Sequence, residues 1–134
     1  MSEPVVIERD IHVPGTILFD LWTQAEHLGD WYCGGGTAVS EPRVGGVREL
    51  TGHDDAGNPW REHGTYLTVE AARQITCSLT GSEASVLTVS LEDTGGSTHV
   101  TLTHTGLKDA QQRDAAAQQW QARLTALINY LSAI

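Results

Sequence analysis

The feature that most constrains the fold is a run of alternating apolar and polar residues between about residues 38 and 105. Successive strand residues point to opposite faces, so a period of two predicts short antiparallel strands with one buried face and one face in water. The clearest strands are REHGTYLTVE, RQITCSLT, ASVLTVSLE and THVTLTHT, with EPRVGG, HDDAGNP, TGSE and DTGGS as turns. The residues expected to point inward are Leu67, Val69, Ile75, Cys77, Leu79, Leu87, Val89, Leu91, Val100, Leu102 and His104.

The last segment, KDAQQRDAAAQQWQARLTALINYLSAI, predicts one long helix. Trp120, Leu124, Leu127 and Leu131 follow one another at spacings of four, three and four residues, which places them in one stripe on a polar helix. A sheet with one apolar face and a helix with one apolar stripe can cover each other. The three alanines at 115–117 leave room for a cavity beneath the sheet, although alanine is also simply the best helix former.

The N-terminal part predicts one strand and two short helices. Apolar residues recur mostly at even spacing from Val5 to Val13, and Pro14 with Gly15 ends this strand. The helical stretches that follow end at the glycines 34–36 and have apolar positions at Leu18, Leu21, Trp22, Ala25, Leu28 and Trp31. The order of elements predicts an α+β fold: one domain, residues 1–134, in which a curved antiparallel sheet wraps around the long C-terminal helix.

Composition restricts the partners of the chain. A formal charge of −9 with only 8 lysines and arginines argues against nucleic acid and against anionic membrane surfaces. The first residues lack the basic and apolar regions of a signal peptide, and no apolar run approaches the roughly 20 residues of a membrane helix. We therefore expect a cytoplasmic protein in which Cys33 and Cys77 are reduced thiols.

Several residues together indicate a known family: Arg9 before Pro14, the segment ILFDLWTQAEHLGDWY, the pair Gly45 and Gly46, Gly57, Gly64, His104 two residues before Gly106, and Trp120 with Leu124 and Leu127. This ordered set resembles the START-like (birch-pollen-allergen-like, SRPBCC) superfamily with its helix-grip fold. More narrowly, it resembles the family of the C-terminal domain of the heat-shock ATPase activator. The resemblance implies a cavity between sheet and long helix, often suited to a small apolar ligand. It also implies stress-response, co-chaperone-like, polyketide cyclase or lipid-carrier relatives, and a homodimer.

The candidate ligand-binding residues surround this expected cavity. Trp31 is expected to anchor the short helix in the core, while Tyr32 and Cys33 form an exposed, flexible lip before the glycines. His104, in phase with the last strand, and His63, in phase with Leu67, are the expected polar contacts, although a buried histidine can equally serve the core. The full set is Trp31, Tyr32, Cys33, His63, Tyr66, Cys77, Val89, Leu102, His104, Ala116 and Trp120.

Three functions stay open from the sequence. The first is a domain that binds a small apolar or amphipathic ligand, or acts like a co-chaperone, without catalysis, since no nucleophile, base and orienting group occur together. The second is a polyketide cyclase-like or hydrolase-like enzyme with His104, His63 or Tyr66 as acid or base. The third is a module that binds a client or chaperone protein through its sheet or the WYCGGG loop. We expect no cofactor and no metal, because the cysteines and histidines lack the close paired spacing of metal ligands.

Overall fold

A curved antiparallel sheet and one long helix make up most of the chain. The structure is a computed structural model that describes residues 3–54, 56–79 and 85–133; the predicted turn TGSE lies outside these ranges. Within them, one sheet has seven strands in the spatial order β1-β7-β6-β5-β4-β3-β2, every neighbouring pair antiparallel. The strands are β1 (Val5–Ile11), β2 (Thr37–Ser40), β3 (Val47–His53), β4 (Pro59–Glu70), β5 (Gln74–Leu79), β6 (Ser85–Asp93) and β7 (Thr98–Thr105).

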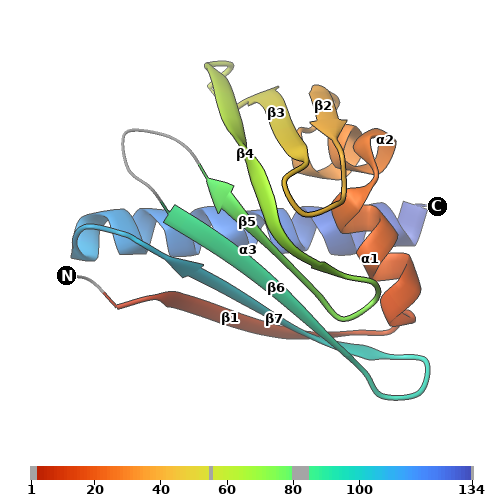
Figure 1. Cartoon of the computed structure of the whole chain (residues 1–134). Coiled ribbons are helices and arrows are strands. Elements are labelled where there is room, and N and C mark those ends of the chain that lie inside the picture. The colour runs from red at the N-terminus through yellow and green to blue at the C-terminus, as the bar shows by residue number, and fades with distance from the viewer. Residues whose placement is uncertain (1–2, 55, 80–84, 134) are drawn as a thin grey trace.

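The helices occupy the two places that the sequence predicts. After β1 come α1 (Gly15–Thr23), the single turn α2 (Ala25–His27) and the π-helical turn η1 (Leu28–Tyr32), and α3 (Ala110–Ala133) follows the last strand. Figure 1 shows α3 crossing one face of the sheet while the strands curve around it. This arrangement confirms the predicted α+β helix-grip fold. None of the described helices combines the length and apolar character needed to span a membrane.

The inward phase predicted for the last three strands is confirmed. All nine side chains expected to point inward from β5, β6 and β7 are buried: Ile75, Cys77, Leu79, Leu87, Val89, Leu91, Val100, Leu102 and His104. Their opposite face, rich in threonine and serine, is less buried throughout. Apolar and polar residues alternate without interruption in these strands, so every second side chain points to the same face along the whole strand.

The phase predicted for β4 is wrong at Leu67, which is 47% exposed. The pairing with β5 shifts register between Tyr66 and Thr68, so residues before the shift point inward at even positions and Val69 is half-buried after it. A bulge of this kind reverses the alternation, so every side chain before it points to the face opposite to the one predicted from the residues after it. Gly64 is buried on the inward side. A Cβ there would sit 1.8 Å from the carbonyl oxygen of Ser78, so the position has no room for a side chain.

The three glycines after η1 have distinct structural reasons. Gly34 and Gly35 take left-handed backbone angles, with φ of 62° and 93°, that other residues adopt at a cost. Gly36 packs directly on β3, where a Cβ would lie 2.0 Å from the carbonyl oxygen of Thr51. The loop is therefore a tight return against the sheet, and Cys33 before it is only 3% exposed rather than on an exposed lip.

The α3 stripe closes the core as predicted. Trp120, Leu124 and Leu127 are buried and Leu131 packs partly against them, while Ala116 is the one buried residue of the three alanines at 115–117. Trp31 anchors η1: its ring meets Trp22 edge-on with centroids 4.9 Å apart, and its Nε1 donates a hydrogen bond of 2.7 Å to the carbonyl of Leu21.

Candidate ligand cleft

An open cleft of about 280 Å³ lies where the middle of α3 faces the loop after η1 and the tip of the β3–β4 hairpin. Aromatic side chains from η1 and β4 line it, together with one arginine from α3. The lining residues are Trp31, Tyr32, Cys33, Gly34, His53, Asp54, Trp60, Gln119, Ala122, Arg123 and Ala126.

A second hollow of about 520 Å³ shares His53 and Trp60 with this cleft and runs along β2, β3 and β4. It is larger, but none of the described residues that line it has a buried charged side chain, whereas the smaller cleft has Arg123. Ligand sites typically combine apolar walls with a few convergent polar groups, so we place the candidate site in the smaller cleft.

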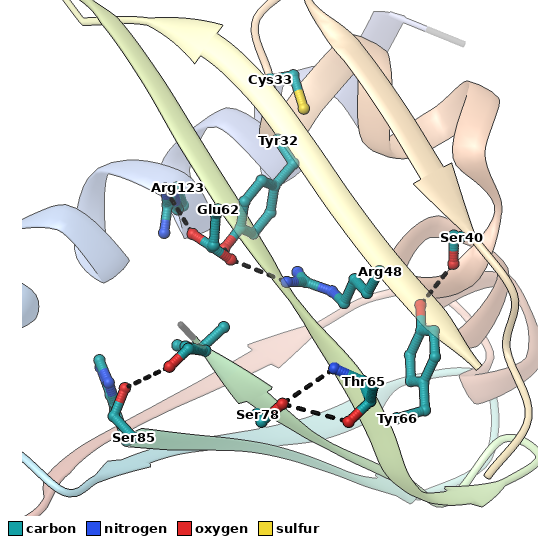
Figure 2. Close-up of polar contacts among 12 residues, drawn as sticks. Tyr32, Cys33, Ser40, Arg48, Glu62, Thr65, Tyr66, Ser78, Ser85 and Arg123 are labelled. Carbon is teal, nitrogen blue, oxygen red and sulfur yellow. Dashed lines mark hydrogen bonds and ion pairs between the residues drawn. The ribbon is translucent and has the colours of Figure 1, made fainter. Parts of the chain in front are cut away.

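Beneath the cleft lies a cluster of four polar side chains, Tyr32, Arg48, Glu62 and Arg123, which we call the Glu62 cluster (Figure 2). They come from η1, β3, β4 and α3 and converge on one carboxylate. Arg48 Nη1 donates to Glu62 Oε1 over 2.8 Å, and the Tyr32 hydroxyl donates to the same oxygen over 2.7 Å. Arg123 Nη2 lies farther away, 3.4 Å from Oε2. The register of β4 before its bulge puts Glu62 on the inward face, where these partners meet it.

The electrostatics of the cluster favour charged Glu62 and neutral Tyr32. Burial raises the pKa of Glu62, but the two guanidinium charges of Arg48 and Arg123 outweigh it and leave the pKa below its usual value. Burial raises the pKa of the Tyr32 hydroxyl far above its ordinary range, so it acts as a hydrogen-bond donor. Two guanidinium groups and one carboxylate leave the cluster with one net positive charge.

Arg123 sits among aromatic rings. Its guanidinium carbon is 4.2 Å from the ring centroid of Tyr32, 4.7 Å from that of Trp120 and 5.3 Å from that of Trp60. Attraction to the ring faces holds a cation in a partly desolvated place. In the part of the chain that the structure describes, its one ion pair is the 3.4 Å contact with Glu62. Its described partners are therefore three aromatic rings and one ion pair at long range.

Arg48 is also incompletely satisfied. Its Nε and Nη2 are buried and have no hydrogen-bond partner among the described residues. Its neighbour Tyr66 is engaged elsewhere: the Tyr66 hydroxyl lies 2.6 Å from Ser40 Oγ, which itself donates to the carbonyl of Thr23. Because the serine proton is used in that bond, Tyr66 donates its own proton to Ser40.

The His104 ring is held as a neutral base by Trp120. Trp120 Nε1 donates to His104 Nδ1 over 2.9 Å, which fixes the proton of the neutral ring on Nε2. That Nε2 is buried without a hydrogen-bond partner in the described ranges. Burial, reinforced by the charge of Arg123, lowers the pKa of His104 despite the opposing charge of Glu62. Among residues that the structure describes, no three His, Cys, Asp or Glu side chains gather where they could hold a metal ion.

The residues predicted for the cavity divide into three groups. Trp31, Tyr32 and Cys33 line the cleft, but all three are buried, so the expected exposed lip of Tyr32 and Cys33 is wrong. The core holds the buried side chains of Tyr66, Cys77, Val89, Leu102, His104, Ala116 and Trp120. His63 is exposed on the outer face of β4, contrary to its expected inward direction, because the bulge reverses the assumed phase. That these residues bind a ligand stays a prediction.

Sequence reasoning missed Arg48, Glu62, Arg123 and Trp60. The strongest signal was in α3, where Arg123 falls three residues after Trp120 and one before Leu124, inside the apolar stripe. Glu62 points to the same face of β4 as Gly64 and Tyr66. That this face is the inward one follows only once the bulge in β4 is known. Charged residues are usually exposed to solvent. A prediction of buried positions from apolar periodicity therefore misses a cluster of buried charged side chains.

Comparisons with solved structures bear on the fold, and a family model bears on the family. The chain resembles solved structures of a protein from Mesorhizobium loti (21% identity, 98% of each chain covered, TM-score 0.84) and of an HSP90 activator from Plasmodium falciparum (19% identity, 98% and 97% covered, TM-score 0.81). A protein from Chromobacterium violaceum is similar over 96% and 97% of the two chains, with 18% identity and a TM-score of 0.85. A comparison with curated proteins found no match. The model of the family described as "Activator of Hsp90 ATPase homolog 1-like protein" matches residues 12–132, and the chain therefore belongs to that family.

Proposed function

We propose that this chain is a non-catalytic domain that binds a small apolar or amphipathic molecule in the cleft beside α3. One observation carries the proposal: the cleft brings three aromatic side chains, Trp31, Tyr32 and Trp60, against a buried cation, Arg123. Apolar walls with a single polar anchor are typical of small-molecule sites. The tight loop at 34–36 and the aromatic packing hold these walls in place without a ligand.

The chemistry of the neighbouring polar groups favours binding over catalysis. His104 accepts a hydrogen bond from Trp120, the Tyr66 hydroxyl donates to Ser40, and neither lines the cleft. Burial raises the pKa of Tyr66, which makes it a weaker acid than an ordinary tyrosine. His63 lies on the outer face. A cyclase-like or hydrolase-like mechanism needs an acid or base within hydrogen-bond reach of a bound substrate, so we keep that alternative second.

Native mass spectrometry of the purified chain, compared with a denatured run, is the first experiment. An extra mass that disappears on denaturation is the expected result, and the same spectrum tests the predicted homodimer. We then expect Ala126→Trp, which fills the cleft wall, to abolish the bound mass. Ala115→Trp, on the exposed side of the same helix, is the matched control. A ligand retained equally by both variants would place it outside the cleft and contradict the proposal.

A co-chaperone role is the second candidate. The fold of the HSP90 activator from Plasmodium falciparum is similar over nearly the whole chain, and this observation favours a chaperone-type partner. Exposed apolar side chains on the strands near the β2 edge, Val39, Val47 and Leu67, offer contact area for a protein. Adding the purified chain to an HSP90 and measuring ATP hydrolysis tests this role. Stimulation of ATP hydrolysis by both the unmodified chain and the Ala126→Trp variant supports this role. A hydrolysis rate that the unmodified chain leaves unchanged contradicts it. For either role we propose a cytoplasmic location.

A further inference from the structure

We propose that the ligand of the cleft is an anion: a small aromatic carboxylate of one or two rings, whose carboxylate pairs with Arg123 and whose rings lie against Tyr32 and Trp60. This inference rests on the proposed function and names the class of ligand for the same site. It is carried by three features of the described residues, namely the charge of the Glu62 cluster, the aromatic surroundings of Arg123 and the size of the cleft.

The Glu62 cluster contains one carboxylate for two guanidinium groups. Arg48 and the Tyr32 hydroxyl both bind Oε1 of Glu62 at hydrogen-bond distance, whereas Arg123 reaches Oε2 over 3.4 Å. Arg123 is thus the cation with the weaker counterion, and it is also the one that lines the cleft. A second carboxylate delivered through the cleft would give Arg123 a closer counterion than the shared Glu62 and would neutralise the surplus positive charge of the cluster.

The surroundings of Arg123 fit an aromatic acid better than an aliphatic one. The rings of Tyr32, Trp60 and Trp120 stabilise its charge but supply no carboxylate or carbonyl acceptor for its N–H groups. A planar carboxylate can pair with a guanidinium through two parallel hydrogen bonds. Tyr32 and Trp60 then offer faces and edges on which an aromatic ring can pack.

The size and the rim of the cleft limit how large the ligand can be and where its charge can lie. A cavity of about 150 Å³ is known to hold benzene, so 280 Å³ suits one or two rings with a carboxylate. Among the described residues of the lining, Asp54 is the one carboxylate and would repel an anion. Its Oδ1 accepts hydrogen bonds from the backbone amides of Ala56 and Asn58 at 3.0 and 2.8 Å, and its Oδ2 accepts one from the Asn58 side-chain amide at 3.4 Å. The repulsion is therefore partly screened at the rim, while Arg123 lies at the base.

Isothermal titration calorimetry with 2-naphthoate and its uncharged isostere 2-naphthamide tests the inference. We expect the unmodified chain to bind naphthoate at least tenfold more tightly than naphthamide. Arg123→Met keeps an unbranched apolar side chain and removes the charge, so the two ligands should then bind equally. Arg113→Met removes a cation from the same helix outside the cleft and should preserve the preference. Arg123→Lys keeps the charge without the planar fork and should reduce the preference only partly.

Each contrary outcome has a definite meaning. Equal binding of naphthoate and naphthamide to the unmodified chain overturns the anion preference and leaves the proposed function standing. Binding of naphthoate that Arg123→Met does not weaken overturns the role of Arg123. If neither ligand nor uncharged 2-naphthylmethanol binds, the anion inference and the proposed binding function both fail. The comparison of ligands uses the unmodified chain, so a variant that does not fold leaves this test intact.

Discussion

Replacing Arg48 by methionine should destabilise the fold far more than the same change at Arg123. Arg48 is 1% exposed and binds Glu62 Oε1 over 2.8 Å, so Arg48→Met leaves a buried carboxylate with only the Tyr32 hydroxyl and a long contact to Arg123. Removing one partner of a buried ion pair typically costs about 3–5 kcal/mol. Arg48 also carries two unpartnered buried donors, and their loss relieves an existing penalty. We therefore expect the lower end, about 3 kcal/mol.

Arg123→Met should change the stability by no more than about 1 kcal/mol in either direction. It removes the surplus positive charge and leaves Arg48 and Glu62 as a neutral pair, while methionine keeps apolar contact with the surrounding rings. Urea unfolding followed by tryptophan fluorescence measures both free energies, and thermal unfolding should show a drop of roughly 10–15 °C for Arg48→Met. Equal destabilisation by the two variants would refute the assignment of Arg48 as the principal partner of Glu62.

Three further predictions concern stability and thiol chemistry. Hydrogen bonds to the carboxylates beside it raise the pKa of His99 to about 8. Its contribution to stability is thus complete below its ordinary pKa of about 6.5 and lost as the pH rises through 8. His99→Gln should flatten this dependence of the thermal midpoint on pH, and an unchanged slope would contradict it. Burial raises the pKa of both Cys33 and Cys77, so Ellman's reagent should label them slowly in buffer and promptly in denaturant; rapid labelling of the folded chain would show the burial to be wrong. Gly64→Ala should destabilise the chain by about 2–3 kcal/mol, because the added Cβ meets a β5 carbonyl, and equilibrium unfolding within 1 kcal/mol of the parent would refute that contact.

The fold was predictable from the sequence where one period persists. The strands β5 to β7 alternate without a break, and the α3 stripe continues from Trp120 to Leu131, so side-chain direction follows from residue type alone. The apolar spacing between Leu18 and Trp31 likewise predicted the short helices after the first strand. At Leu67 the same reasoning fails, because a bulge is a property of the pairing between two strands and leaves no clear trace in one of them.

The site was only partly predictable, for a different reason. Trp31, Tyr32 and Cys33, predicted from their place before the glycines, line the cleft, and their binding of a ligand stays a prediction. Arg48 and Glu62 are charged residues on strands, and their burial depends on mutual neutralisation across β3 and β4. Each charged side chain in such a cluster is stable in the core only because the others are present. The burial of any one of them therefore cannot be predicted from its own position in the sequence.

The place of β1 in the sheet has a consequence for how the chain folds. β1 pairs with β7, joining Val5 to His104 and Ile11 to Thr98, so the first strand finds its partner almost a hundred residues later. Closing so long a loop is entropically costly and slows folding relative to local contacts. Hairpins from β3 to β7 can form between neighbours in the chain, whereas β1 can pair only once β7 is present. We therefore expect the cleft, which needs α3 against the β3–β4 hairpin, to be among the last features to assemble during folding.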